Sequence, residues 1–213
     1  MILLTAAKMP DGLDKSILAQ AVGLMFSNFQ NEGYFRESKE RENDFSACES
    51  LFALALLYEQ ICSLPCHIDP SQLVFERGEC GKPYFRDSDV KFNISHSKGY
   101  VACAVSVGEE LGVDIEAAEI SADRAERLAK RYFSAKERSD IEKAPESFAR
   151  RWTEKEAKAK FFAQSIGNIL LDGKNTTIPS DFIDFCYHRF AFGKIPITLC
   201  TKRDYSTIIF TAQ

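Results

Sequence analysis

The spacing of apolar residues predicts helices early in the chain and strands near its middle. Apolar residues recur every three or four positions over residues 13–29, and residues 45–61 form a more continuous apolar run, typical of a helix buried on most sides. Pro and Gly residues between 65 and 83 indicate a loop-rich stretch. A turn at 95–99 is expected to join the first two of three short strands. These strands are predicted over residues 90–94, 100–107 and 111–115.

Helix signals then return, followed by β-rich runs. Ser121–Phe133 is predicted to be a helix that begins at the cap residue Ser121. Ser134 is expected to cap a second, short helix, with Glu137 three residues later as its capping-box partner. A third helix is predicted to start near Pro145 and to run past Phe161 as far as Gly167. The β-rich runs cover residues 182–192, 195–201 and 207–210.

Helices therefore precede strands twice along the chain, which predicts an α+β fold. The repeated order suggests two similar halves that meet near Glu110, residues 1–109 and 110–213, although no direct sequence repeat relates them. With 213 residues, the chain is long enough to bury a core without a disulfide or a structural metal.

Composition narrows the class of protein. A net charge of −4 argues against a general nucleic-acid binder. The longest apolar run, Leu51–Tyr58, is far shorter than the ~20 residues that cross a bilayer, so we expect no membrane span, and the N-terminal residues lack a signal-peptide pattern. The chain has seven cysteines, an odd number that cannot all pair in intrachain disulfides, and their spacing is not that of a zinc site. We therefore expect reduced thiols and a cytoplasmic protein.

The charge is distributed unevenly. Residues 121–160 contain twelve Lys and Arg against eight Asp and Glu, within an otherwise acidic chain. Arg124, Arg127 and Arg131 have helical spacing and would form one positive stripe. Such a segment is either a local docking surface for an anionic partner or a solvated helix face.

Two carboxylates occur at alternate positions in the strand predicted at 111–115 and just after it. Asp114 and Glu116 would share one face of the strand, because side chains alternate between faces. Adjacent carboxylates repel each other unless a cation or a proton lies between them, and oxygen ligands favour Mg²⁺ or Ca²⁺. The alternative is a strand end with both acids in solvent.

A second group of residues lies on the third predicted helix of this region. Trp152, Glu156 and Lys160 are spaced by four and form one stripe, which could supply a third carboxylate and a phosphate-binding lysine. Glu154 would point elsewhere. The alternative is a helix flank with a surface ion pair.

A third group lies around residues 92–97. The predicted turn containing Ser95 and His96 would present hydroxyl, imidazole and amide groups to an anion, with Lys82 upstream as a further positive charge. Such a turn can also be purely structural. Taken together, however, three acids with lysines and a histidine are typical of Mg²⁺-assisted displacement at phosphorus.

Four motifs occur in a fixed order: Gly81-Lys82-Pro83, then FNISHS at 92–97, GVDIE at 112–116 and FARRWTEKEAKAK at 148–160. This series resembles the 4′-phosphopantetheinyl transferases, in particular the larger monomeric type named for the surfactin-synthetase-activating enzyme. The resemblance covers residues 81–160. It implies two α+β halves related by a pseudo-twofold axis, with coenzyme A in the cleft between them.

The resemblance also implies a reaction and a set of site residues. Members transfer 4′-phosphopantetheine from coenzyme A to a serine of an apo acyl or peptidyl carrier protein and release 3′,5′-ADP. Magnesium would be held by Asp114, Glu116 and Glu156. Glu156 would also act as the general base, directly or through water, and Lys160 would be the second catalytic residue. The expected phosphate contacts are Lys82, His96 and Lys160, with Ser95 and Lys155 as further contacts.

The sequence departs from the pattern in two places. Relatives reach a glycine soon after the last lysine, whereas here residues 161–166 precede Gly167. The basic residues that bind the 3′-phosphate of coenzyme A are also displaced, and Arg41 is the candidate chosen from Arg36, Lys39 and Arg41. The two alternative functions are a Mg²⁺-dependent nucleotide pyrophosphatase that acts on coenzyme A and a non-catalytic homologue that binds coenzyme A or a carrier protein.

Overall fold

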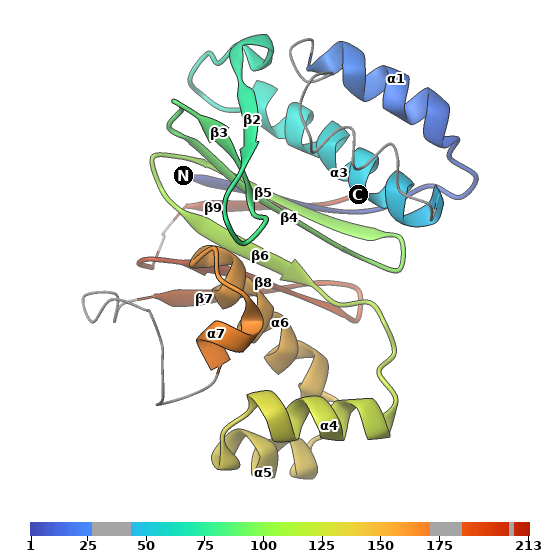
Figure 1. Cartoon of the computed structure of the whole chain (residues 1–213), viewed down its shortest axis with the longest axis vertical. Coiled ribbons are helices and arrows are strands. Elements are labelled where there is room, and N and C mark those ends of the chain that lie inside the picture. The colour runs from blue at the N-terminus through green and yellow to red at the C-terminus, as the bar shows by residue number, and fades with distance from the viewer. Residues whose placement is uncertain (27–43, 171–184, 205–206) are drawn as a thin grey trace.

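We describe a computed structural model of the chain over residues 1–26, 44–170, 185–204 and 207–213. Its first layer is a sheet with the strand order β4-β5-β1-β9, in which β1 pairs antiparallel with β5 and parallel with β9. The strand closest to the C-terminus thus completes the sheet that contains the first strand (Figure 1). The strands are β1 (Ile2–Lys8), β4 (Val90–Ser97), β5 (Tyr100–Val107) and β9 (Ile208–Ala212).

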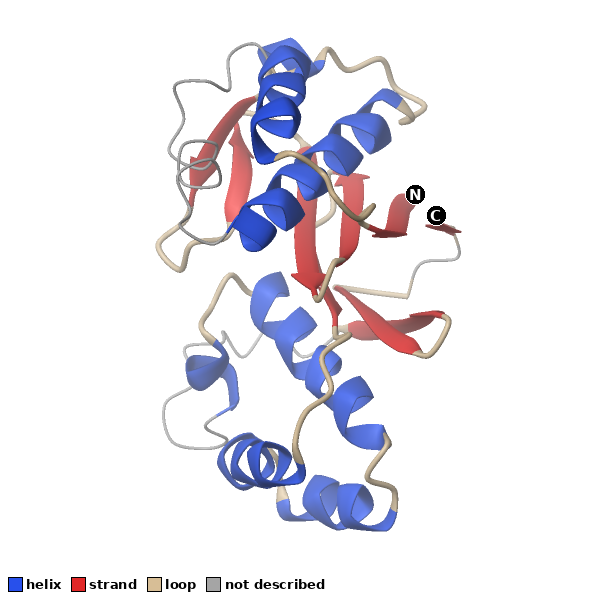
Figure 2. Cartoon of the chain, turned by 90° about the vertical axis from the view of Figure 1, so that its right-hand side faces the viewer, coloured by secondary structure: helices blue, strands red, loops and turns tan. Residues whose placement is uncertain are grey.

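Two helices, α1 (Lys15–Met25) and α3 (Asp44–Cys62), cover one face of this sheet (Figures 1 and 2). Alternation along β5 explains the arrangement: Val101, Cys103 and Val105 pack toward the helices, whereas the alternate alanines pack on the opposite face. By length and composition α3 could cross a membrane, but 61% of its apolar window is buried in the protein, which is typical of a core helix.

A second antiparallel sheet has the order β6-β8-β7 and contacts the opposite face of the first sheet through Leu111, Val113 and Leu199. Its strands are β6 (Leu111–Ile115), β7 (Cys186–Phe192) and β8 (Ile195–Thr201). Helix α6 packs against β6 and β8, while α4 and α5 extend beyond the sheet (Figure 1). The helices of this region are α4 (Ala122–Tyr132), α5 (Ala135–Lys143), α6 (Ser147–Phe161) and α7 (Ile166–Leu170). The helix predicted to reach Gly167 ends earlier, at Phe161, because Ala163 adopts a left-handed backbone conformation.

The close contact between α6 and β6 depends on Gly112. A Cβ atom at this position would lie 2.2 Å from the carbonyl oxygen of Ala157 and 2.3 Å from the backbone nitrogen of Phe161. No side chain fits there, so glycine sets how near the helix comes to the strand. This distance in turn positions the residues of α6 relative to the carboxylates of β6.

The mixed α+β fold is confirmed. The division at 109/110 and the pseudo-twofold axis stay predictions. The sequence did not indicate β1, whose residues pack into both clusters of the core and therefore show little alternation. The expected loop-rich stretch contains a short 3₁₀ helix and a hairpin. These elements are the helix at Pro70–Gln72 and the strands β2 (Val74–Arg77) and β3 (Pro83–Arg86).

Candidate active site

The expected turn at Ser95–Gly99 is wrong, because β4 continues through Ser97 and only Lys98 and Gly99 turn the chain. Alternate side chains of β4 therefore face β6 instead of presenting a loop to an anion. The Ser95 hydroxyl donates to Asp114 Oδ1 at 2.7 Å. The Ser97 hydroxyl donates to Glu116 Oε1, also at 2.7 Å. The two serines thus hold the two carboxylates in place.

Asp114 lies at the centre of this arrangement and is 5% exposed. The amine of Lys160 approaches its Oδ1 atom to 2.7 Å and also donates to the Ser95 hydroxyl at 2.8 Å. Burial raises the pKa of Asp114, while the Lys160 amine and the Ser95 hydroxyl partly offset that effect. The resulting buried ion pair joins α6, β4 and β6 at one point.

Glu156 lies one helical turn before Lys160, as the predicted stripe requires. Burial raises the pKa of Glu156, and the negative charge of Asp114 raises it further, with a smaller contribution from Glu116. The three acidic side chains therefore affect one another electrostatically, as expected for oxygen ligands of a divalent cation. In the described part of the chain, however, no three acidic, His or Cys side chains converge on a single ion in the present arrangement.

His96 faces the opposite side of β4 from Ser95, toward α3. Its Nδ1 atom lies 3.1 Å from Oε2 of Glu49, and its Nε2 atom lies 3.5 Å from the Ser50 hydroxyl. Glu49 is 5% exposed, and its other oxygen accepts a 2.6 Å hydrogen bond from the backbone N–H of Gly99. Burial raises the pKa of Glu49, but the bonds from His96 and Gly99 outweigh it, so the pKa lies below its ordinary value.

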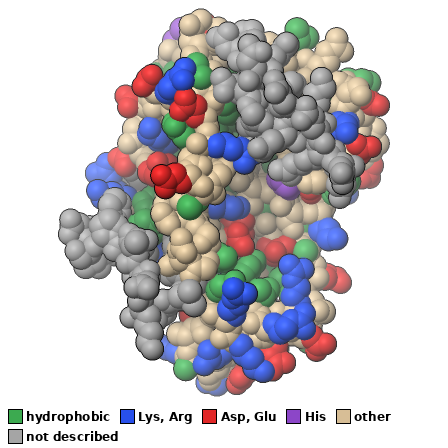
Figure 3. Space-filling model, in the orientation of Figure 1, with side chains coloured by type: hydrophobic (Ala, Val, Ile, Leu, Met, Phe, Trp, Pro, Cys, Tyr) green, Lys and Arg blue, Asp and Glu red, His purple; other side chains and the backbone are tan. Residues whose placement is uncertain are grey.

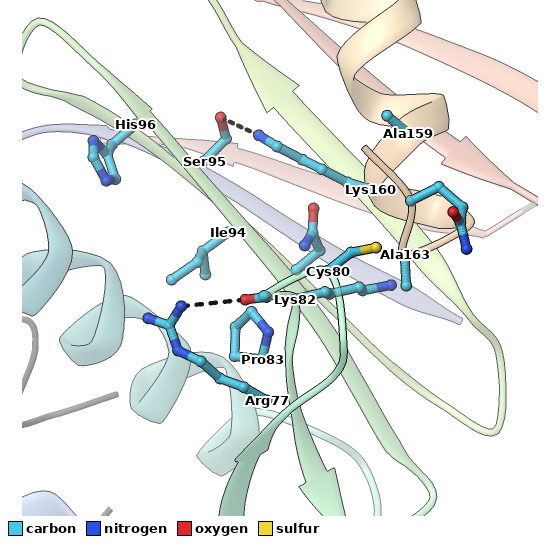
Figure 4. A pocket seen from close by; sticks show the side chains of 13 residues that line it. Arg77, Cys80, Lys82, Pro83, Ile94, Ser95, His96, Ala159, Lys160 and Ala163 are labelled. Atoms are coloured by element: carbon cyan, nitrogen blue, oxygen red, sulfur yellow. Dashed lines mark hydrogen bonds between the residues drawn. The ribbon is translucent and has the colours of Figure 1, made fainter. Parts of the chain in front are cut away.

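A pocket of about 330 Å³ opens beside these groups, between the β2–β3 hairpin, β4 and the end of α6 (Figure 4). Lys160 reaches across it from α6 to Ser95, and His96 lines the side next to α3. Basic, acidic and histidine side chains gather at the middle of this face of the molecule (Figure 3). Four positively chargeable residues line the pocket: Arg77, Lys82, His96 and Lys160.

Lys82 lines the pocket, but its amine is held by other groups. It donates to Oε1 of Glu110 and to the carbonyl of Leu111, each at 2.9 Å. Burial lowers the pKa of Lys82, and the adjacent Glu110 carboxylate opposes this shift. In this arrangement Lys82 also ties the β2–β3 hairpin to the start of β6.

Of the expected phosphate contacts, Lys155 does not line the pocket. Lys155 points to α5, where it pairs with Glu137 at 2.9 Å and lies over the ring of Phe133. Arg41 lies outside the described residues. The sequence interpretation missed Glu49 and Arg77. A single acid inside the apolar run at 45–61 was the available signal for Glu49, whereas Arg77 is placed only by the hairpin, where it donates to the Gly81 carbonyl.

Comparison with known proteins matches residues 110–209 to a family model described as the 4′-phosphopantetheinyl transferase superfamily. The 4′-phosphopantetheinyl transferase Sfp of Bacillus subtilis is 32% identical over 151 residues, which cover 68% of this chain and 60% of Sfp. HetI of Nostoc, with the same descriptive name, is 33% identical over 48% of this chain and 46% of HetI. The match to Gsp of Aneurinibacillus migulanus is 31% identical over 54% of this chain and 46% of Gsp. The chain thus spans between about half and three fifths of these relatives.

Proposed function

The chain is a member of the 4′-phosphopantetheinyl transferase superfamily, and we propose that it transfers 4′-phosphopantetheine from coenzyme A to a serine of an apo acyl or peptidyl carrier protein. The reaction would depend on Mg²⁺ and release 3′,5′-ADP. The observation that supports this most strongly is the buried Asp114, which lies within the electrostatic reach of two further carboxylates and beside a pocket lined by cationic groups. Transfer from a pyrophosphate ester requires carboxylates that hold a metal ion and cationic side chains that neutralise the phosphate charge.

Asp114, Glu116 and Glu156 would hold the magnesium ion. Their chemistry fits, since all three supply oxygen ligands and their mutual repulsion would be relieved by a divalent cation. When bound, the ion supplies charge neutralisation at the pyrophosphate. Lys160 now neutralises Asp114, so binding at this position would share that carboxylate between two cations.

The other residues of the site would bind and orient the substrate. Lys160 and His96 line opposite sides of the pocket and could contact separate phosphate oxygens of one ligand. Glu156 would accept the proton from the incoming serine hydroxyl, directly or through water. Coordination to a metal ion weakens a carboxylate as a base, which favours transfer of this proton through a water molecule.

We also propose that the protein acts in the cytoplasm as a monomer. All seven cysteines are free in the structure, which is consistent with a reducing compartment. The partner would be a carrier protein, which presents an acidic helix beside its target serine. The exposed arginines of α4 offer complementary charge for such a surface.

Intact-mass spectrometry tests the proposal. An apo carrier protein is incubated with the purified chain, coenzyme A and Mg²⁺, and a gain equal to phosphopantetheine is expected on the carrier. Glu156→Gln should abolish this gain. Glu154→Gln is the matched control, because Glu154 lies two residues away on α6 and pairs with Arg189 instead.

Two results would contradict the proposal. Release of phosphopantetheine from coenzyme A with no change in carrier mass would identify a pyrophosphatase. Binding of coenzyme A with neither product, across a panel of acyl and peptidyl carrier proteins, would identify a non-catalytic homologue.

A further inference from the structure

Glu49 has no role in the site as inferred from the sequence, yet its burial requires an explanation. Moving an ionised carboxylate out of water is costly unless charged or hydrogen-bonding partners compensate. Glu49 has two partners: the Nδ1 atom of His96 at 3.1 Å and the backbone N–H of Gly99 at 2.6 Å. His96 is near the end of β4 and Gly99 is in the turn that follows, so the carboxylate joins α3 to the strand that borders the pocket.

The contact with Glu49 determines which imidazole nitrogen remains for a ligand. A carboxylate only accepts hydrogen bonds, so the Nδ1 atom of His96 must carry the proton in this pair. The partner of one ring nitrogen fixes the tautomer and orientation of the whole ring. Among the described residues, the other nitrogen, Nε2, has the Ser50 hydroxyl alone as a partner, at the outer limit of hydrogen bonding, 3.5 Å away. His96 also lines the pocket, so Nε2 is the ring atom that donates to a bound anion when it too carries a proton.

We propose that Glu49 is a positioning residue: it accepts the Nδ1–H of His96 and so orients the ring for Nε2–H to donate to a phosphate of coenzyme A when both ring nitrogens carry a proton. This inference rests on the proposed function for the identity of the ligand. Glu49 itself does not contact the substrate, since it lies on the α3 side of the ring.

A purely structural role for Glu49 makes a different prediction. If the carboxylate only anchors the β4–β5 turn through Gly99, its removal should lower stability without any link to His96. A positioning role instead makes the effects of the two residues on ligand affinity non-additive, because Glu49 then acts on the ligand only through the His96 ring. A double-mutant cycle on affinity therefore separates the two roles.

The cycle measures the Kd of coenzyme A for wild type, Glu49→Ala, His96→Ala and the double variant. Glu49→Ala should weaken binding about tenfold, the scale of one hydrogen bond to a charged group. The double variant should bind no more weakly than His96→Ala alone. Glu49→Gln should recover most of the loss, because its amide oxygen can still accept from Nδ1. Glu59→Ala, an exposed acid on the same helix, is the control and should match wild type.

Nitrogen-15 NMR of the imidazole ring supplies a readout that needs no substrate. In the unliganded wild type, the neutral His96 ring should be protonated at Nδ1, and Glu49→Ala should shift the proton toward Nε2. His67 and His188 serve as internal references. A wild-type ring protonated at Nε2 would overturn the proposal even if Glu49→Ala fails to fold.

The affinity data can also overturn it. Unchanged coenzyme A affinity in Glu49→Ala, or equal losses in the wild-type and His96→Ala backgrounds, would leave Glu49 a structural residue only. If the wild type neither binds coenzyme A nor modifies a carrier, the proposed function and the stated ligand fail together. In that case the NMR result still shows whether Glu49 sets the ring.

Discussion

The substitution Gly112→Ala should disable the protein by a change of one methyl group. Gly112 is in β6 at the point where α6 crosses the strand, two residues before Asp114. An added Cβ would lie 2.2 Å from the Ala157 carbonyl oxygen and 2.3 Å from the Phe161 nitrogen. Both are backbone atoms, so no side-chain rotation can relieve the clash.

The size of the effect follows from these distances. The Ala157 carbonyl would have to retreat by about 1.3 Å to restore an ordinary contact of ~3.5 Å. Forcing an extra carbon into a packed core typically costs about 1–3 kcal/mol, and the rigid backbone here places the cost toward the upper end. Glu156 and Lys160 lie on the displaced turns, and a misplacement of ~1 Å can reduce a rate about 100-fold.

Urea unfolding and the carrier-modification assay measure the two consequences separately. We expect the free energy of unfolding to fall by about 2–3 kcal/mol and transfer to fall about 100-fold in the protein that remains folded. Gly167→Ala is the control, because an added Cβ there has no neighbour nearer than 3.9 Å. It should leave stability and activity close to wild type. A Gly112→Ala protein with wild-type stability and rate would refute the role assigned to this contact.

Three further predictions use other parts of the structure. Ala163→Gly should raise the free energy of unfolding by about 1 kcal/mol, because Ala163 has φ +50° where α6 ends; an unchanged urea midpoint would contradict this. Asp114→Asn should abolish transfer but keep the fold, since the amide oxygen can still accept the hydrogen bonds that Asp114 accepts. Circular dichroism measures the fold and the mass of the carrier measures transfer; full activity would exclude Asp114 as a metal ligand. Replacing all three arginines of the stripe on α4 with alanine should raise the apparent KM for the carrier protein and make it less dependent on salt, while the KM for coenzyme A stays unchanged. A carrier KM and salt dependence equal to those of the wild type would show that the stripe is only a solvated helix face. The stripe consists of Arg124, Arg127 and Arg131.

Features set by neighbours in the sequence were predictable. The capping box of Ser134 and Glu137 is present as expected, because both of its bonds lie within three residues. Glu156 and Lys160 share a helix face for the same reason. The missing glycine after Lys160 also has a local outcome: Ala163 adopts the left-handed conformation, with the N–H of Gln164 bonded to the Ala159 carbonyl.

Features set by distant partners were not predictable. Ser95 and Ser97 resemble turn residues when considered with their neighbours alone, but their hydroxyls bond to carboxylates 19 residues away, in β6 and directly after it. Those bonds keep β4 extended beyond the predicted end of the strand. Glu49 likewise meets His96 only once α3 has packed on the sheet. In both cases the tertiary partner overrides the local preference.

Lys160 combines a structural and a proposed functional role, and this affects how its substitution is interpreted. Asp114 is buried and has Lys160 as its ion-pair partner. Removing that amine leaves an uncompensated carboxylate, which costs about 3 kcal/mol when one partner of a buried pair is lost. A loss of activity in Lys160→Ala would therefore combine destabilisation with any lost phosphate contact. In an Asp114→Asn background the charge penalty is absent, so the remaining effect of Lys160→Ala on coenzyme A affinity measures the phosphate contact alone.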